Sequence, residues 1–397
     1  MLTLLRYKYH SVYKYQWSFS LLAVIITLYN IFIKTNIFIG GQMSQQLNNR
    51  TPWLDMARSF AIFFVVLCHA TERIYRDPNS LSNISMVFRI FCFTIGRLGV
   101  PIFLFLTGYL LLSREYKTGL DCSNFYKKKL FPLLITVEIW IVLYNIFLPL
   151  YHNIPFNFTS MLKQMIFIEK TPIAHMWYMP MILGLYLVLP LLSRAIKDLS
   201  LYSLAYPLLV SVLLFLILPN INVLLDILKI DAIEGVRIDF SFLGGQYGIY
   251  LISGYYLGKG ALRKIPNITL YMVCGIFFLF TCWFQFFAYR NGYAYNVWYN
   301  FIGIFIASVC LFEIISRINL KNKMIVRALN KVSVFSLGVY FLHMPVQLIL
   351  QKILYLDVFN CSIRVIVLFG LSSIISCLIV QMTNRFTYIN KILYLTK

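Results

Sequence analysis

Residues 55–72, DMARSFAIFFVVLCHATE, place a cation and an imidazole inside one apolar stretch. Arg58 and His69 are eleven residues apart, and at about 100° per residue eleven steps make three helical turns plus roughly 20°. In a helix both side chains therefore point the same way, about 16 Å apart at a rise of about 1.5 Å per residue. Because ionisable groups inside a membrane are costly, their alignment predicts a functional site.

The composition of the chain is that of an integral membrane protein. Of its 397 residues, 60% are hydrophobic and only 12% are charged, whereas about 25% of the residues in a typical soluble domain are charged. The formal net charge of +21 does not indicate nucleic-acid binding, because the basic residues lie between apolar segments rather than on one soluble face. The positive-inside rule accounts for them.

Ten apolar runs are long enough to cross a membrane, which predicts an all-α, polytopic integral membrane protein. The distribution of Lys and Arg assigns alternate loops to the cytoplasm and places both the residues before Arg58 and the C-terminus there. One exception is the loop near 75–96, whose stretch ISMVFRIFCF is expected to lie along the membrane interface. The ten runs are 57–74, 96–113, 131–150, 177–193, 202–219, 242–258, 268–288, 297–316, 332–351 and 362–382.

Residues 1–51 are expected to form an N-terminal extension with one doubtful apolar segment, at 17–33. This segment could be a helix that does not fully cross, a removed signal-like segment, or a consequence of a start assigned too early, with Met43 as the true first residue. The polar stretch after Met43 favours the third interpretation. The membrane domain is expected to cover 52–385, followed by a cytoplasmic tail at 386–397.

Histidine and cysteine are the first residue types to consider for chemistry. The eight cysteines include no CxxC pair and no disulfide or zinc spacing, so we expect small packing residues and no metal site. Three of the five histidines, His69, His175 and His343, lie in or at the ends of predicted spans. A single buried histidine is often only a core residue, but three in so apolar a chain indicate a site.

Glu72 lies three residues after His69 and so shares its helix face. A carboxylate there can fix the imidazole tautomer and raise its basicity, as the acid of a Ser-His-Asp triad does. The alternative is that Glu72 marks the helix exit and pairs with Arg73 or Arg76. The first interpretation makes Glu72 an orienting group of the catalytic histidine.

The second span, GRLGVPIFLFLTGYLLL at 96–112, carries Arg97 at its outer mouth and Tyr109 deeper in the membrane. Pro101 and Gly108 predict a kink and a close helix contact. Arg97 is the more telling residue, because an arginine at a cavity mouth can hold a carboxylate, a phosphate or a polar sugar.

Two later stretches add polar and aromatic candidates. In AHMWYMPMILG, which starts at residue 174, His175, Trp177 and Tyr178 form either an interfacial aromatic belt or a platform for a sugar ring. In SLGVYFLHMPVQ, residues 336–347, Tyr340 and His343 lie three apart on one helix face.

Glu138 is the acidic residue deepest in a predicted span, within FPLLITVEIWIVLY. An ionised carboxylate at that depth needs a partner, and without one it is protonated. We expect Glu138 to pair with an arginine or a histidine of the site.

Together these stretches resemble the membrane-bound acyltransferase 3 family, whose members transfer acetyl or related groups to sugars of cell-envelope polymers. Four matches occur in family order from about residue 52 to residue 382. They are Leu54-Asp55 followed by Arg58 and His69, GVPIFLFLTGY after Arg97, HMWYMPMILGLYLVLPLL, and GVYFLHMP. The family typically has a Ser-Gly pair where this chain has Thr107-Gly108. The apolar run at 17–33 has no counterpart in the family pattern.

Within the family, the chain looks most similar to the stand-alone branch that acetylates O-antigen of lipopolysaccharide, enterobacterial common antigen or exopolysaccharide. The resemblance implies acetyl-CoA as co-substrate, no tightly bound cofactor, a polysaccharide or lipid-linked glycan as acceptor, and location among the lipids of the bacterial cytoplasmic (inner) membrane.

The resemblance also suggests roles for individual residues. Arg58 is expected to bind the phosphates of the donor, with Lys127, Lys128 and Lys129 widening that attraction, although membrane topology alone also explains the three lysines. His69 is expected to act as general base on the acceptor hydroxyl or, alternatively, to carry the acyl group as an acyl-imidazole. Candidates for oxyanion stabilisation or acceptor binding are Arg97, Tyr109, His175, Trp177, Tyr178, Tyr340 and His343.

Two other functions are compatible with buried polar residues. An exporter or flippase of a polysaccharide or lipid-linked sugar also places Arg, His and Glu along a substrate pathway. Many transporters show internal repeats, and no clear repeat relates the two halves of this chain. A sensor or structural membrane protein would use the polar residues only to pack helices.

Overall fold

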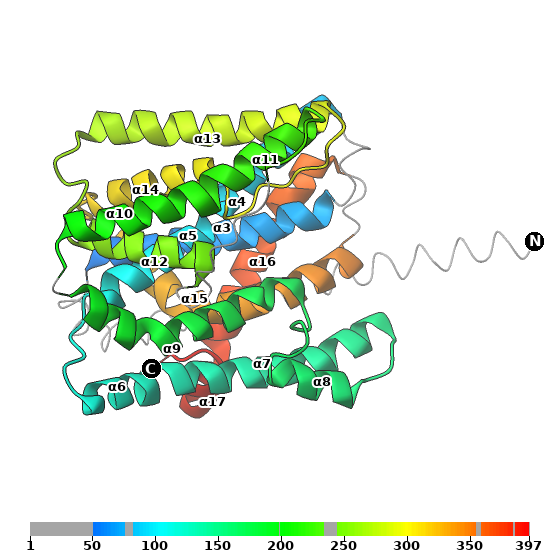
Figure 1. Cartoon of the computed structure of the whole chain (residues 1–397). Coiled ribbons are helices and arrows are strands. Elements are labelled where there is room, and N and C mark those ends of the chain that lie inside the picture. Colours follow the sequence, from blue (N-terminus) through cyan, green and yellow to red (C-terminus); the bar gives the residue numbers. More distant parts are fainter. Residues whose placement is uncertain are drawn as a thin grey trace, which may run out of the picture. The chain divides into compact units, whose positions relative to one another are not determined.

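The computed structural model describes residues 51–75, 82–197, 199–233, 244–354, 359–383 and 386–396. All regular structure within these ranges is helical, which confirms the predicted all-α class. Eight helical segments are long and apolar enough to cross a membrane (Figure 1). They are Pro52–Ile74, Asn83–Leu112, Gly119–His152, Ala174–Ile196, Leu201–Ile227, Asn267–Arg290, Lys323–Ile353 and Cys361–Thr383.

Each of these eight segments overlaps one predicted span. The other two predicted spans correspond to α12 (Gly245–Gly258) and α14 (Ile302–Ser316), which have 14 and 15 residues. A straight crossing of the hydrocarbon core takes about 20 residues, so the count of ten spans and the cytoplasmic placement of both termini stay predictions. The N-terminal apolar run at 17–33 lies outside the described residues.

Several spans combine two or more helical elements. In chain order the elements around the site are α3 (Pro52–Ile74), α4 (Asn83–Arg97), α5 (Gly99–Thr107), the π-helical turn η3 (Gly108–Leu112), α6 (Gly119–Phe125), the π-helical turn η4 (Tyr126–Leu130), α7 (Phe131–His152), α8 (Phe158–Met165), the 3₁₀ turn η5 (Ala174–Trp177) and α9 (Tyr178–Ile196). They are followed by α10 (Leu201–Val212), η6 (Leu213–Ile217), α11 (Leu218–Ile227), α12, α13 (Asn267–Arg290), α14, α15 (Lys323–Ile353), α16 (Cys361–Thr383) and α17 (Thr387–Leu393).

The second span begins earlier than the sequence predicted. The stretch ISMVFRIFCF, expected along the membrane interface, belongs to α4, which packs against α3 and α13. Its Arg89 is only 6% exposed and donates to Asn296 Oδ1 at 2.5 Å. The helix is interrupted at Leu98, three residues before Pro101, which has no N–H to donate to the carbonyl of Arg97. The interface prediction is therefore replaced by a long, interrupted helix.

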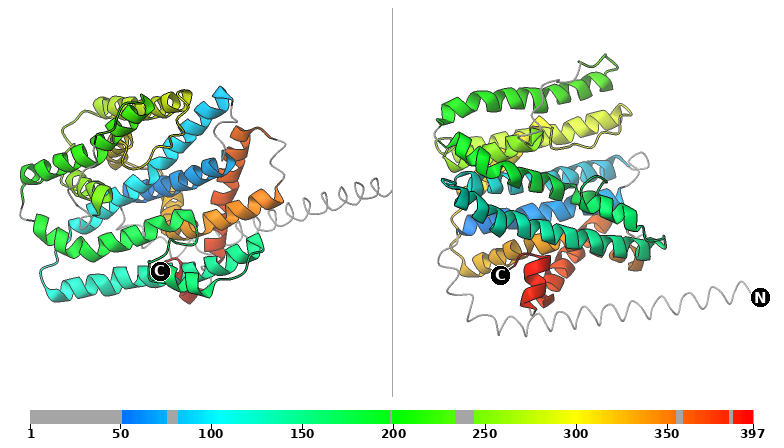
Figure 2. Two further views of the ribbon diagram at one scale, coloured as in Figure 1. Left: turned by 45° about the vertical axis from the view of Figure 1, so that its right-hand side comes forward. Right: turned by 60° about the horizontal axis from the view of Figure 1, so that its bottom comes forward.

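Helix α3 is the hub of the described fold. It packs against α4 and α5 on one side and against α15 and α16 on another. Figure 2 shows α3, in blue, between the cyan second span and the orange and red helices α15 and α16. Asp55 ties α3 to α15, because it accepts hydrogen bonds from Asn330 Nδ2 at 2.9 Å and Ser333 Oγ at 2.7 Å. The helix that carries Arg58 and His69 is thus held from both sides.

Two glycines allow the second span and α12 to touch through their backbones. A Cβ atom added to Gly108 would lie 1.8 Å from the carbonyl oxygen of Leu251, and one added to Gly254 would lie 2.3 Å from that of Phe105. The expectation that Gly108 serves a close helix contact is confirmed. This contact holds α5 and η3, which form one wall of the site.

Replacing Gly108 by alanine is therefore expected to separate α12 from the second span and lower stability. Overpacking costs typically about 1–3 kcal/mol, and a backbone atom cannot move aside as a side-chain tip can. Gly184→Ala in α9 is the matched control, because a Cβ there meets nothing within 4 Å. Thermal unfolding of the purified protein, followed by size-exclusion chromatography, should show a lower melting temperature for Gly108→Ala only. Equal melting temperatures for the two variants would contradict the close contact.

Candidate active site

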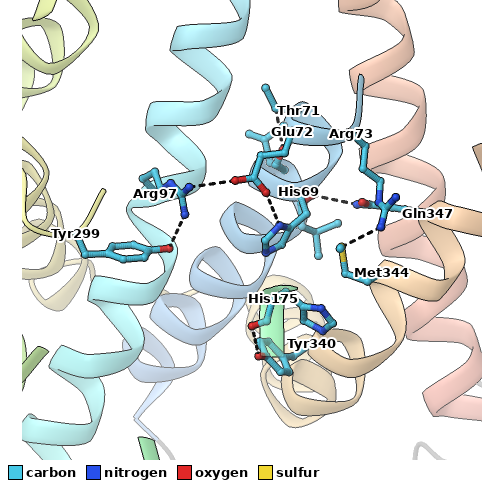
Figure 3. Close-up of polar contacts among 12 residues, drawn as sticks. His69, Thr71, Glu72, Arg73, Arg97, His175, Tyr299, Tyr340, Met344 and Gln347 are labelled. Atoms are coloured by element: carbon cyan, nitrogen blue, oxygen red, sulfur yellow. Dashed lines mark hydrogen bonds and ion pairs between the residues drawn. The ribbon is translucent and has the colours of Figure 1, made fainter. Parts of the chain in front are cut away.

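His69 belongs to a chain of polar side chains that crosses from α3 to α4 (Figure 3). His69 Nδ1 lies 2.7 Å from Glu72 Oε2, and the other Glu72 oxygen, Oε1, accepts from Arg97 Nη2 at 3.0 Å. A proton on Nδ1 satisfies the carboxylate, which leaves the lone pair on Nε2 for a reacting group. The contact between His69 and Glu72 follows from their three-residue spacing on one helix.

Arg97 is placed differently from the expectation that it holds a substrate group. It is 3% exposed, and its guanidinium lies 4.4 Å from the ring centre of Phe93 and 4.3 Å from that of Trp298. Nη1 donates to the hydroxyl of Tyr299 at 3.3 Å. Arg97 thus holds the protein's own carboxylate, Glu72, and that prediction is corrected.

The alternative partners of Glu72 were Arg73 and Arg76. Arg73 Nη2 instead lies 3.8 Å from the sulfur of Met344, on the α15 side of the site (Figure 3). Arg76 lies outside the described residues. Among the described residues, the ion-pair partners of Glu72 are therefore His69 and Arg97.

The structure brings three histidines from three separate spans together. The ring centres of His69 and His343 are 5.4 Å apart, those of His69 and His175 are 5.9 Å apart, and those of His175 and His343 are 5.0 Å apart. His175 and His343 are buried, with 2% and 0% of their surface exposed, and His175 Nδ1 and His343 Nε2 have no hydrogen-bond partner among the described residues. Two buried nitrogens therefore remain open for a polar group beside His69.

Two tyrosines fix this histidine cluster to α15. Tyr340 donates its hydroxyl proton to the backbone oxygen of His175 at 2.7 Å. Tyr144, on α7, donates to the backbone oxygen of Phe341 and lies 3.4 Å from His175 Nε2. These bonds hold η5 against α15 and so set the position of His175.

Three side chains of the short segment His175–Tyr178 lie in three different parts of the site. His175 joins the histidines, whereas Trp177 packs among aromatic rings, with centroid distances of 5.4 Å to Trp298 and 5.5 Å to Tyr299. Tyr178 lies beside Tyr340, at 6.1 Å between ring centres. The tight 3₁₀ turn Ala174–Trp177 makes this divergence possible, because side chains advance about 120° per residue there.

A cavity of about 380 Å³ lies between α3, the second span, α9 and α15. Arg58, Arg114 and Lys129 contribute cations to its lining, and Val65, Leu106 and Ile182 are among its apolar residues. Tyr178 and Tyr340 also line it. The ring centre of Tyr340 lies 5.1 Å from that of His175 and 6.1 Å from that of His343. His69 is not in the lining, but Val65, one helical turn before it, is. The cavity therefore joins a cationic region to the immediate neighbours of the histidine cluster.

Several predicted site residues lie elsewhere. Tyr109 packs against Trp53, with ring centres 5.2 Å apart, and so lies near the Arg58 end of α3 rather than near His69. Of the three lysines predicted to attract the donor, Lys129 lines the cavity, while Lys127 and Lys128 are exposed and do not.

Glu138 does not pair with an arginine or a histidine of the site. Its Oε2 atom is buried and has no hydrogen-bond partner, and among the described residues Glu138 forms no ion pair. Its helix, α7, packs against α8, α9 and α17 rather than against α3. The prediction of a partner was therefore wrong, since scarcity of acids along the chain does not show which way a side chain faces.

Sequence reasoning missed four residues of the site. Arg114 lines the cavity but was not predicted as a site residue, although its position two residues after the second span is a usable signal. Tyr144, Trp298 and Tyr299 carry no local signal, because aromatic residues are common throughout this chain.

The family model of the acyltransferase 3 family, described as an acyltransferase domain, matches residues 51–382. The chain therefore belongs to this family. Neither a curated protein nor a solved structure matches the chain. With its apolar helices, the family defines the protein as an integral membrane acyltransferase.

Proposed function

We propose that the protein transfers an acetyl group from acetyl-CoA to a hydroxyl of a cell-envelope polysaccharide or its lipid-linked precursor, such as O-antigen, at the bacterial inner membrane. The observation that carries this proposal is the cavity that joins three cations to the surroundings of His69. A transporter needs no such junction between phosphate-binding groups and an oriented imidazole.

The donor fits the cavity by its chemistry. Arg58, Arg114 and Lys129 supply the charge that binds a pyrophosphate, and the arginines can do so with two parallel hydrogen bonds. The apolar residues of the cavity lining, such as Val65, Leu106 and Ile182, match the chemistry of the pantetheine arm. Arg58 and His69 are separated by about 16 Å along a helix, which suits an arm that carries a thioester from phosphates at one end to an imidazole at the other.

The transfer step needs a base and an oxyanion donor. His69 Nε2 takes the proton of the acceptor hydroxyl as its oxygen attacks the thioester carbonyl; the carbon–sulfur bond then breaks, and the thiolate leaves and receives that proton. Base assistance of this kind contributes about 10²–10⁴-fold. Glu72 fixes the imidazole, and Arg97 fixes Glu72. Tyr178 lines the cavity and supplies a hydroxyl donor for the oxyanion, whereas the hydroxyl proton of Tyr340 is donated to the backbone oxygen of His175.

The acceptor side is supported by the aromatic residues around Arg97. Trp177 is partly exposed and lies beside Trp298, Tyr247 and Tyr299. Flat aromatic faces suit the apolar face of a sugar ring. The open nitrogens His175 Nδ1 and His343 Nε2 suit its hydroxyl groups.

Replacing Arg58 by alanine is expected to raise the KM for acetyl-CoA by about 10- to 100-fold, the value of one charge-assisted bond to phosphate. The kcat should change little, because Arg58 lies away from the reacting atoms. Transfer of radiolabelled acetyl from acetyl-CoA to the host polysaccharide by the purified protein measures both constants. Lys264→Ala, an exposed cation that does not line the cavity, is the control and should match the wild type. An unchanged KM for Arg58→Ala would contradict the donor site.

A further inference from the structure

A second, smaller pocket adjoins the cationic part of the cavity. Its volume is about 150 Å³, and four of the six residues that line it are cations. Arg114 lines both this pocket and the larger cavity. The lining consists of Arg114, Tyr116, Lys117, Ser193, Arg194 and Lys197. A group bound here would thus be adjacent to one bound at Arg58 and Lys129.

Hydrogen bonds between two segments build this pocket. Ser193 Oγ, near the end of α9, donates to the backbone oxygens of Leu112 at 3.0 Å and Arg114 at 2.8 Å. Arg194 Nη1 donates to the backbone oxygen of Lys117 at 2.8 Å. The segment 113–118 is therefore fixed on α9, and the cations of both segments face one space.

An internal anion lies between two of these cations. The Glu115 carboxylate is 2.6 Å from Lys117 Nζ and 2.9 Å from Lys197 Nζ. The hydrogen bonds from the two lysines hold the pKa of Glu115 at about 2, well below its usual value. The three side chains are 44–68% exposed, so the pairs are screened by water and easily exchanged.

Arg114 still has donors to offer. Its Nε donates to the backbone oxygen of Leu110 at 3.2 Å, while its two terminal amino groups have no hydrogen-bond partner among the described residues. A phosphomonoester carries close to two negative charges and three acceptor oxygens, more than the single charge of Glu115. Such a group can replace the carboxylate on the lysines and also engage Arg114.

We infer that this pocket binds a phosphomonoester of the acyl donor, displacing Glu115 from Lys117 and Lys197, while the donor's pyrophosphate lies at Arg58, Arg114 and Lys129. The inference rests on the proposed function. Among acyl thioesters, a coenzyme A thioester has this third phosphate on its ribose. A thioester on a carrier protein has a phosphodiester and no such group. The pocket thereby selects the free nucleotide donor.

The test compares acetyl-CoA with 3′-dephospho-acetyl-CoA. Binding of each is measured by calorimetry on the full-length protein in nanodiscs of zwitterionic lipid, with and without phosphatidylglycerol. The wild type should bind the phosphorylated donor about tenfold more tightly, in line with one to two charge-assisted bonds. Lys197→Ala should reduce this preference to about threefold or less. Glu115→Gln should strengthen binding of acetyl-CoA and leave that of the dephospho donor unchanged.

Lys197→Ala should lower the preference for acetyl-CoA over the dephospho donor, whereas Glu115→Gln should raise it. Because a general effect on the fold would not change this preference in opposite directions, the two variants together test ligand binding. Lys264→Ala should leave both donors as in the wild type, since Lys264 lines neither pocket. Equal affinity of an active wild type for the two donors would overturn the assignment while leaving the proposed function intact. A wild type that binds neither donor would overturn both. A preference that appears only without phosphatidylglycerol, with Lys197→Ala altering lipid binding alone, would show an anionic headgroup in the pocket and overturn the assignment.

Discussion

Replacing His69 by glutamine is expected to lower kcat for acetyl transfer by about 10²–10⁴-fold. Glutamine can still donate a hydrogen bond to Glu72, so the contacts of the ion pair between Glu72 and Arg97 are retained. The glutamine side chain, however, cannot accept a proton at neutral pH. The KM for acetyl-CoA should change little, because the cations that we propose as the phosphate site line the cavity and His69 does not. Transfer of radiolabelled acetyl under saturating donor measures the loss.

His152→Gln is the matched control for this variant. His152 is exposed at the C-terminal end of α7 and lines neither pocket, and its replacement should leave kcat unchanged. Both variants should unfold at the wild-type temperature. A His69→Gln protein that is folded and retains more than about a tenth of the activity would rule out general-base catalysis by this residue.

The same assay separates the two routes proposed for His69. Direct transfer leaves no label on the protein when radiolabelled acetyl-CoA is supplied without acceptor. An acyl-imidazole route leaves acid-sensitive label on the wild type and none on His69→Gln. The open Nε2 atom permits either route, and the adjacent nitrogens of His175 and His343 suit an acceptor hydroxyl already in place. We therefore expect direct transfer and an unlabelled protein.

Replacing Glu72 by glutamine should lower kcat by about 10²–10³-fold, somewhat less than the roughly 10⁴-fold loss when the orienting aspartate of a serine protease is made neutral. Glutamine no longer fixes the tautomer of His69 and no longer stabilises the imidazolium that forms. Glu72→Gln also leaves Arg97, which is 3% exposed, without its anion. The Glu72 side chain is 38% exposed, so solvent screens the pair and the loss is smaller than the about 3–5 kcal/mol of a fully buried pair, but the melting temperature should still fall.

The double variant Glu72→Gln/Arg97→Gln distinguishes catalysis from stability. It removes both charges, so part of the lost stability should return, whereas the activity should stay low because His69 still lacks its carboxylate. Thermal unfolding and kcat are measured on Glu72→Gln, on Arg97→Gln and on the double variant. Recovery of kcat together with stability would mean that Glu72 acts only through folding and has no orienting role.

The sequence could predict the helical class and the approximate positions of the eight helical segments that are long enough to cross a membrane, because hydropathy is a local property. It misplaced the start of the second span because local charge counting treats Arg89 as a loop cation and places Arg97 at the mouth of the span. In the folded chain Arg89 meets Asn296 and Arg97 meets Glu72, so neither charge needs water. Such partners lie on other helices, and a hydropathy window contains no information about them.

In the site, too, the sequence predicts what lies within one helix but not what depends on contacts between helices. Arg58, His69 and Glu72 belong to one helix, whose periodicity fixes their common face. The meeting of His175 and His343 beside His69 depends on how α3, η5 and α15 pack, which no single segment determines. Tyr144 and Tyr299 are two of 28 tyrosines, and only their tertiary partners distinguish them.

The most direct test of the proposed function is the O-acetyl content of the host's envelope polysaccharide, measured by NMR in cells that carry the wild type or His69→Ala. We expect O-acetyl signals with the wild type and their loss with the variant, while the length and surface amount of the polymer stay the same. A variant that leaves the polymer acetylated but absent from the cell surface would contradict acyl transfer and indicate export.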